Sequence, residues 1–573
     1  MSISQNRELP PLRLWPGVLL VAVQWVARYV VPRLIPEAMP FAVLGSLALG
    51  LAVVVWWLFF SRASRWERWG GLASLVLAFG ITQQFLHESI ASTMMGLMFP
   101  IYAIPSVCLV LVLWAIAAER WPRARRWGVL AVALLVTCFG WLLVRTNGMT
   151  GAAQQDFAWR WTETAEERLL AQDEAPLRAS ASVLASGSVA EWPGFRGAGR
   201  DSVVTGLAIA TDWNRTPPME VWRQNIGPAV SSFAVQGERI FTQEQRGEEE
   251  LVSCYHRRTG EPLWKHRDAV RFWDSHAGAG PRATPTLYGG RVYSLGGTGL
   301  LNALDATSGD LLWSRDAAGD LDRKAPGWGF AGSPLVTDEL VFVALAGELG
   351  AYERESGELR WRGPAGRYGY SSPHLLERSE GAQVVLMSSF GATAFGPDDG
   401  EVLWEVEMEG TSRIVQPGLT ADGDLLLSDG EGRGLRRHAL TADASGWKAE
   451  ERWSTNRFKP YFNDFVVHGG HAYGFDGPIL ASVDLADGQR NWKGGRYGNG
   501  QLLLLADQDL LLVLSEQGDL ALVSARPDGF EEVARFDGAL DGKTWNHPAL
   551  VDDLLLVRNG VEMAAFRLPR AAG

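Results

Sequence analysis

The strongest constraint on this chain is a phrase that returns through its C-terminal two thirds and ends each time on Trp. NALDATSGDLLW ends at Trp313, GAYERESGELRW at Trp361 and TAFGPDDGEVLW at Trp404. The Trp residues recur 39 to 49 positions apart, and in five copies a Gly precedes the Trp by four positions. The full set is Trp222, Trp264, Trp313, Trp361, Trp404, Trp453 and Trp492, with Gly260, Gly309, Gly357, Gly400 and Gly488. A period of this length predicts repeated supersecondary units that pack on one another.

Each unit holds about four short apolar runs, such as VYSLGG and ELVFVALA, separated by Gly, Asp and Ser. Such runs are typical of strands, and four strands per unit of this length predict a β-propeller. The first Trp strand, 220–227, has no strands before it, and the last strands, 548–568, have no Trp strand after them. If they complete one another, the ring closes with eight blades, and closure removes the exposed edges that an open sheet would present. We therefore predict an all-β eight-bladed propeller.

The N-terminal part of the chain has a different pattern. Its apolar stretches lie near 14–33, 40–60, 69–87, 97–118 and 127–144, and each has the length that crosses a hydrocarbon layer of ~30 Å. Arg28 lies near one end of the first stretch and is expected to extend its guanidinium toward the membrane surface. A stack of buried core helices is the alternative. We predict an α-helical membrane domain of about five transmembrane helices at 1–145, a juxtamembrane linker at 146–190 and the propeller at 191–573.

Arginines orient the predicted helices in the membrane. Loop 61–68 carries three Arg and loop 119–126 carries four, whereas the loop near His87 carries none. Since Lys and Arg concentrate on the cytoplasmic side, both Arg-rich loops and the N-terminus, with Arg7 and Arg13, are placed in the cytoplasm. An odd number of spans then puts residues 146–573 outside. In a bacterium this predicts an inner-membrane protein with its propeller in the periplasm.

Charge and cysteine content exclude some classes of protein. Residues 1–145 carry a net charge of +7 and the remainder a net charge of −19, so nucleic acid is not an expected partner of the C-terminal part. Cys108, Cys138 and Cys254 are far apart in the sequence. They predict neither a disulfide framework nor a cysteine metal site.

The repeated phrase resembles that of a known family. The pattern A-x-D-x-x-x-G-x-x-x-W, present from Ala303 to Trp313, is similar to the pyrroloquinoline quinone (PQQ) repeat. That repeat builds the eight-bladed propellers of quinoprotein alcohol dehydrogenases and of the propeller lipoprotein that helps assemble outer-membrane β-barrels. EWPGFRGAGRDS, at 191–202, resembles the segment that leads into bacterial PQQ-like-repeat propellers. The resemblance is specific to fold rather than to activity.

Candidate binding residues lie in the loops that follow each Trp and lead to the next innermost strand. Because these loops are expected to rim the central channel, their polar and aromatic residues form a candidate funnel for a small planar or anionic ligand. Its members are Arg282, Thr284, Trp328, Ser372, His374, Arg413, Gln416, Asn463, Asp464, Trp545 and Asn546. The two Arg suit carboxylates and the two Trp suit stacking on a ring. A polar channel filled only with water is the alternative.

Two functions of different classes remain open. The first is a membrane-tethered periplasmic module, not an enzyme, that binds an envelope protein or a small ligand. The second, implied by the resemblance, is a PQQ-dependent alcohol or sugar dehydrogenase that holds PQQ with Ca²⁺ and passes electrons to membrane quinone. Asn463 and Asp464 form the one adjacent amide–carboxylate pair at the predicted rim, and they are weak candidates for a metal site. The vicinal Cys pair of many such dehydrogenases does not occur in the sequence.

Overall fold

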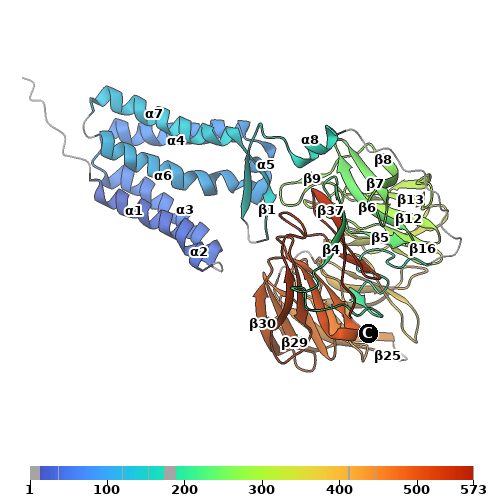
Figure 1. Ribbon diagram of the computed structural model, residues 1–573. Helices are drawn as coiled ribbons and strands as arrows, with labels where there is room; N and C mark the ends of the chain where they lie inside the picture. Colours follow the sequence, from blue (N-terminus) through green and yellow to red (C-terminus); the bar gives the residue numbers. More distant parts are fainter. Residues whose placement is uncertain are drawn as a thin grey trace, which may run out of the picture. The chain divides into compact units, whose positions relative to one another are not determined.

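A computed structural model describes residues 13–35, 38–118, 121–151, 154–172, 189–410, 413–430, 432–443 and 446–571 (Figure 1). The chain forms two compact units. A helical unit comprises Met1–Gly148 with Gln155–Thr162, and a propeller unit comprises Met149–Gln154 with Glu163–Gly573. Arg7, Arg120 and residues 173–188 of the predicted linker lie outside the described residues.

The described part of the helical unit is built from five main helices. In chain order its elements are α1 (Trp15–Trp25), a π-helical turn (Val26–Val30), α2 (Val31–Leu34), α3 (Met39–Val55), a second π-helical turn (Trp56–Phe60), α4 (Arg65–Phe85), α5 (Glu88–Ser92), a 3₁₀ turn (Thr93–Gly96), α6 (Met98–Ala118), α7 (Arg123–Phe139), a 3₁₀ turn (Gly140–Leu143) and the hairpin of β1 (Val144–Met149) and β2 (Gln155–Trp159). Ser64 begins α4 with a capping box, in which its hydroxyl accepts from the N–H of Glu67 and the Glu67 carboxylate accepts from the N–H of Ser64.

Within the described residues, four helical segments are long and apolar enough to cross a membrane: Trp15–Leu34, Met39–Phe60, Met98–Ala118 and Arg125–Leu143. The third predicted stretch, 69–87, falls on α4. This helix qualifies only together with the short helices at Glu88–Gly96, which follow a bend of 115°. The helical unit therefore has four to five candidate membrane spans, in agreement with the five that the sequence predicts.

Arg28 does not extend toward the membrane surface, and that expectation was wrong. Its side chain is buried inside the helical unit with 4% of its surface exposed. The guanidinium lies over the ring of Tyr102, 4.7 Å from its centroid, and 5.4 Å from the ring centroid of Tyr29. The π-helical turn that carries Arg28 thus directs this cation toward α6, where aromatic faces accommodate it.

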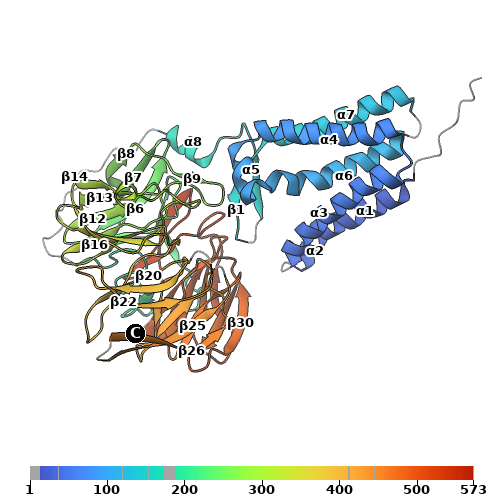
Figure 2. The ribbon, with the colours of Figure 1, turned by 180° about the vertical axis from the view of Figure 1, so that it is seen from behind.

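The propeller unit has eight blades, as predicted. Within the described residues, seven four-stranded sheets and one five-stranded sheet follow one another in chain order (Figure 1 and Figure 2). Blades one to four are β5 (Ala234–Gln236), β6 (Arg239–Arg246), β7 (Glu249–His256) and β8 (Pro262–Asp268); β11 (Thr286–Tyr288), β12 (Arg291–Leu295), β13 (Leu300–Asp305) and β14 (Leu311–Asp316); β15 (Leu335–Val336), β16 (Leu340–Leu345), β17 (Glu348–Glu353) and β18 (Leu359–Arg362); and β19 (His374–Leu376), β20 (Gln383–Met387), β21 (Gly391–Phe395) and β22 (Val402–Glu407).

Blades five to seven continue the ring: β23 (Gly418–Leu419), β24 (Leu425–Ser428), β25 (Leu435–Asp443) and β26 (Gly446–Thr455); β27 (Val466–His468), β28 (His471–Asp476), β29 (Ile479–Asp484) and β30 (Arg490–Arg496); and β31 (Gln501–Leu505), β32 (Leu510–Leu514), β33 (Leu520–Ser524) and β34 (Glu532–Phe536), with β3 (Val203–Val204) added parallel to β31. Smaller elements are α8 (Ala165–Leu170), β9 (Trp273–Asp274), β10 (Gly278–Ala279) and α9 (Ala317–Asp320).

The eighth blade closes the ring with strands from both ends of the propeller sequence. It consists of β35 (Ala549–Val551), β36 (Leu554–Arg558), β37 (Glu562–Arg567) and the early strand β4 (Met219–Asn225). β4 pairs antiparallel with β37, and Trp222 lies opposite Ala565. The predicted exchange between the incomplete first and last units is therefore confirmed, and closure removes two sheet edges.

The repeated Gly and Trp meet at every contact between the blades that carry them. A Cβ added at Gly309 would lie 2.5 Å from Cε3 of Trp264, so the indole of one blade packs directly on the glycine turn of the next. Gly260, Gly357, Gly400 and Gly488 lie in the same way against the Trp of the preceding blade. The indole N–H of Trp264 also donates to the Ala306 carbonyl in that turn. The phrase repeats because five of the contacts between neighbouring blades are built in this same way.

Candidate functional site

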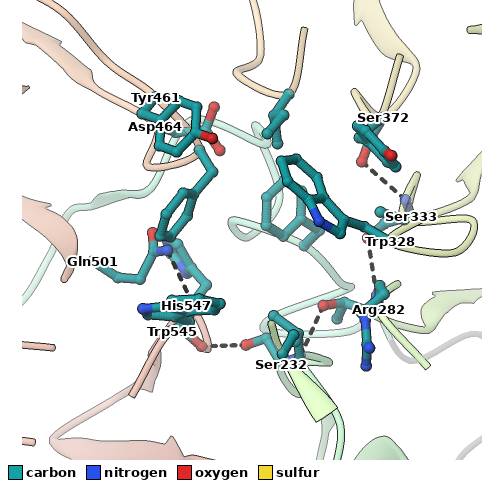
Figure 3. A pocket seen from close by; sticks show the side chains of 18 of the residues that line it. Ser232, Arg282, Trp328, Ser333, Ser372, Tyr461, Asp464, Gln501, Trp545 and His547 are labelled. Carbon is teal, nitrogen blue, oxygen red and sulfur yellow. Dashed lines mark hydrogen bonds between the residues drawn. The ribbon is translucent and has the colours of Figure 1, made fainter. Parts of the chain in front are cut away.

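The loops that lead into the innermost strands enclose a cavity of about 260 Å³ on the propeller axis, here called the cup (Figure 3). This volume lies just below the ~300–1,000 Å³ of most small-molecule pockets. Every blade contributes to the cup, which is lined by Phe195, Ser232, His276, Arg282, Thr284, Trp328, Ser333, Tyr370, Ser372, Gln416, Tyr461, Phe462, Asp464, Gln501, Trp545 and His547, among others.

One residue from each blade forms a polar belt around the cup, at or just before the start of the innermost strand. The belt consists of Ser232, Thr284, Ser333, Ser372, Gln416, Asp464, Gln501 and His547. The N–H of Ser232 donates to Oγ1 of Thr284, the N–H of Thr284 to Oγ of Ser333, and the N–H of Ser333 to Oγ of Ser372, each at 2.9 Å. These groups form hydrogen bonds with one another across neighbouring blades. They therefore stiffen the ring and are not free to bind a ligand.

Aromatic side chains from the loops that precede the belt residues also line the cup. Trp328 packs against Tyr370 with ring centroids 5.0 Å apart and against His276 at 6.0 Å. Phe462 packs against Trp545 at 5.1 Å. Figure 3 shows Trp328 on the opposite side of the cavity from Gln501 and His547. The cup therefore offers mainly ring faces and edges, which suit an apolar or aromatic group.

The segment 191–202, called the lead-in, closes the channel beyond the belt. Phe195 lines the cup and meets the ring of His547 edge-on at 5.8 Å. The other contacts of the lead-in include belt residues and the residues directly after them: Arg200 donates to the carbonyls of Ser333 and Pro334, and Arg196 donates to the carbonyl of Phe465. The aromatic rings come from residues that precede the belt, on the other side from the lead-in. The lead-in therefore forms the floor of the cup, and the rings surround its mouth.

The floor contains a buried cluster of charged groups. Nη1 of Arg196 lies 3.6 Å from Oδ1 of Asp464, which also accepts from the N–H of Gln416 at 2.6 Å. Burial raises the pKa of Asp464, and Arg196 opposes this rise. Burial and the charge of Arg196 lower the pKa of Arg200 to about 10. They lower the pKa of His547 to about 3, so its imidazole is neutral at pH 7 and shares a 2.9 Å hydrogen bond with the Ser202 hydroxyl.

Seven of the eleven residues named from the sequence line the cup: Arg282, Thr284, Trp328, Ser372, Gln416, Asp464 and Trp545. Arg282 is not available to a ligand carboxylate, because it donates to the carboxylate of Asp274 and to the carbonyls of Gly278, Ala279 and Gly280. Its role is to hold the loop that carries His276.

The other four residues are buried behind the lining. Arg413 has no exposed surface and donates to the carbonyls of Ser388, Met408, Glu409 and Ser428. The side-chain amide of Asn463 donates to the Gly500 carbonyl, and that of Asn546 to the carbonyls of Ala229 and Ser231. His374 is buried in β19, where burial followed by the charges of Arg200 and Arg196 lowers its pKa to about 3. These side chains support the ring and do not reach the cup.

The residues of the cup do not fit PQQ with Ca²⁺. Calcium requires several oxygen ligands, with carboxylates and amide carbonyls among them. Asp464 lies against Arg196, and its neighbour Asn463 is engaged with Gly500. Among the described residues, no group of three or more His, Cys, Asp or Glu is placed to hold a metal ion. The guanidiniums that a quinone carboxylate would need, Arg282 and Arg413, are satisfied inside the protein.

Sequence reasoning missed the lead-in arginines, Phe195 and Glu516. The sequence does contain a signal for the belt, because Pro follows five of its eight members. Nothing local marks Arg196, whose partner Phe465 is 269 positions away. Glu516, in the turn between β32 and β33, accepts from the indole N–H of Trp545 at 2.7 Å.

The chain matches a family model described as outer membrane protein assembly factor BamB over residues 214–386 and 388–530. A protein of that name from Yersinia pestis is 24% identical over 340 residues, which cover 56% of this chain and 75% of the relative. Its namesake from Shewanella oneidensis is 28% identical over 210 residues, covering 35% of this chain and 48% of that protein. Among solved structures, a europium-containing methanol dehydrogenase superposes with a TM-score of 0.51 at 11% identity, covering 66% of this chain and 98% of that one. This structural likeness concerns the fold alone.

Proposed function

Because this chain belongs to the PQQ-repeat propeller family described as outer membrane protein assembly factor BamB, we propose that it is a protein-binding module, without catalytic activity, tethered to a bacterial inner membrane. The relatives that match it carry the name of an assembly factor. An assembly factor must bind other proteins, and a rigid propeller with a shaped axial mouth supplies a surface for that purpose.

The observation that carries this proposal is the composition of the cup. Its walls are aromatic rings, its belt is hydrogen bonded to itself, and its Asp464 and Arg282 are neutralised by Arg196 and Asp274. A dehydrogenase needs a polarising cation and a base free to accept a proton. A recognition site needs apolar surface that is rigid and complementary to its partner. The cup has the second set of properties.

The proposed topology places the propeller in the periplasm. Arg62, Arg65 and Arg68 lie between the second and third predicted spans, and Arg123, Arg125 and Arg126 begin the last span. Both groups are expected to face the cytoplasm. Single-cysteine variants at Arg62 and at the propeller residue Glu238, in a chain without native cysteines, test this with a membrane-impermeant maleimide. In intact spheroplasts we expect labelling at position 238 only. Labelling at position 62 would contradict the proposed orientation.

Binding at the cup is tested by site-specific photocrosslinking in cells that express the full chain. A photoreactive amino acid replaces Tyr370 or Trp328 at the mouth, and a control replaces Leu311 on the outer strand β14, where 48% of the side chain is exposed. We expect a discrete protein adduct from the mouth positions and not from position 311. The identified partner should then bind the purified full chain and bind the Trp545→Ala variant at least about tenfold more weakly.

Two results would contradict this function. The first is the absence of a protein adduct from every mouth position while the chain is folded and in the membrane. The second is turnover of an alcohol or sugar by the purified full chain after addition of PQQ and Ca²⁺, which would favour the dehydrogenase.

A further inference from the structure

The mouth of the cup already holds a short piece of this chain. Met149, Thr150 and Gly151, here called the tip, line the cup together with the aromatic rings. They belong to the propeller unit. The N–H of Thr150 donates to the Gln154 carbonyl at 2.9 Å. Of the three tip residues, Met149 carries the apolar side chain.

Glu516 receives the tip. The N–H of Gly151 donates to Oε1 of Glu516 at 2.6 Å, and the same oxygen accepts from the indole of Trp545 at 2.7 Å. Oε2 accepts from the N–H of Asn499 at 3.1 Å. The residue is only 2% exposed, and within the described part of the chain no basic side chain forms an ion pair with it. A buried carboxylate without a cation depends on N–H donors such as these.

The fit at Gly151 is close. A Cβ added there would lie 1.8 Å from Nδ2 and 2.5 Å from Cγ of Asn499, so a larger residue requires the Asn499 side chain or the tip to move. The hydrogen bond from the Gly151 N–H to Glu516 joins the tip to the rest of the propeller. The loss of a charge-assisted bond of this kind changes an equilibrium by roughly ten- to a hundredfold. The site is therefore specific in shape, and loss of the Gly151 bond is enough to shift the balance between the bound and the released tip.

We propose that the cup binds an extended segment of a partner protein by the chemistry of the tip, and that the tip occupies the cup when no partner is present. The segment presents a main-chain N–H at a glycine to Glu516 and an unbranched apolar side chain to the rings of Trp328, Phe462 and Trp545. Met suits such a ring-lined site because its flexible thioether packs well against aromatic edges. This inference rests on the proposed function, since it names the chemistry of the protein partner.

The test uses the full chain in detergent and a fluorescent peptide, acetylated and amidated, with the sequence of residues 147–154, NGMTGAAQ. Fluorescence anisotropy measures its dissociation constant. Two variants release the tip by different means: Gly151→Val adds bulk against Asn499, and Gly151→Pro removes the N–H. We expect both to bind the peptide at least about tenfold more tightly than the natural chain, because the competing tip is gone.

Glu516→Gln, added to Gly151→Val, is expected to weaken peptide binding about tenfold, whereas Glu531→Gln, at an exposed position, should not change it. A peptide with Ala in place of Met should bind more weakly to every variant. Equal affinity of the natural chain and both Gly151 variants would show that the tip does not compete, and absence of peptide binding by both variants would overturn the inference.

These failures are distinguishable from failure of the proposed function. If a partner protein crosslinks at Tyr370 or Trp328 while the peptide binds no variant, the cup recognises proteins by another chemistry, and only this inference is wrong. If neither the crosslink nor peptide binding is observed, both are wrong.

Discussion

Replacement of Arg196 with Met is expected to destabilise the propeller by about 3–5 kcal/mol, because it leaves the buried carboxylate of Asp464 without its cation. At the observed 3.6 Å and an effective dielectric constant of about 20, two unit charges attract by roughly 4–5 kcal/mol. The variant also loses the hydrogen bonds of Arg196 to the Ser202 hydroxyl and to the carbonyls of Asp201 and Phe465.

The ionic part of this loss is isolated by a double-mutant cycle. Asp464→Asn removes the charge and keeps an oxygen that can accept from Gln416, so alone it should cost about 1–2 kcal/mol. In Arg196→Met with Asp464→Asn neither member of this ion pair is left charged without the other. The double variant is therefore expected to be at least about 2 kcal/mol more stable than the sum of the single losses predicts. Additivity within about 0.5 kcal/mol would refute the reasoning.

The sign of the pH dependence gives a second check on the same pair. Burial raises the pKa of Asp464 above its ordinary 3.8. The fold therefore favours the neutral carboxyl group of Asp464. The stability that this preference adds is fully present below pH 3.8 and is lost as pH rises through the pKa that Asp464 has in the folded protein. Without Arg196 this pKa should rise further. The deficit of Arg196→Met should then be largest at pH 7 and smallest near pH 4, whereas the variant that also carries Asp464→Asn should not show this recovery.

Cys254 provides the assay. Its thiol is fully buried, and burial raises its pKa to about 12, so it should react with a maleimide only when the propeller opens. In a full chain that carries Cys108→Ala and Cys138→Ala, pulsed labelling across a urea gradient reports the propeller transition separately from the helical unit. The natural, single and double variants are compared in this background at pH 7, 5 and 4.

Two further predictions use the same assay. Gly309→Ala should lower the stability of the propeller by about 2–4 kcal/mol, because φ is +80° and the new Cβ would lie 2.5 Å from Trp264. The control is Gly290→Ala, at φ +77° with no atom within 4 Å of its Cβ, which should lower stability by only about 1–2 kcal/mol. Equal losses would show that the Trp contact adds nothing. Glu244→Gln should destabilise the propeller at pH 7, because the pKa of Glu244 is held at about 2 despite burial, by Arg246 and by hydrogen bonds from Tyr255, Ser253 and Gly227. The stability that its carboxylate contributes is present above about pH 4.5 and is lost as pH falls toward 2, so a difference between variant and natural chain that stays constant from pH 7 to 3 would contradict this assignment.

The sequence predicted the fold well because the contacts that build it are local and recur in every blade. Trp264 on Gly309 and Trp313 on Gly357 are the same contact, so the spacing between them is visible without knowledge of the ring. The exchange of β4 into the last blade was also predictable, since the two ends of the repeat were each incomplete.

The candidate site was predicted only in part, and the errors have a geometric cause. Asn463 and Asn546 each stand one position before a belt residue, and successive side chains on extended backbone point to opposite sides. Asp464 and His547 therefore line the cup, whereas Asn463 and Asn546 point into the ring. The expectation that the loops after each Trp rim the channel identified the correct region of each blade. It could not determine which of two successive residues faces the cavity.

The parts of the site that break the eightfold repeat were the hardest to predict, and they decide how the cup is closed. The belt is Ser or Thr in blades one to four but Gln, Asp, Gln and His in blades five to eight. The lead-in contacts both halves, with Arg200 on the Ser333 carbonyl, Arg196 beside Asp464 and Ser202 on His547. If the lead-in were turned by one blade, Arg196 would no longer face a carboxylate and Ser202 would no longer face an imidazole. The irregular half of the belt thus fixes the rotation of the lead-in, and with it the position of Phe195 beneath the aromatic mouth.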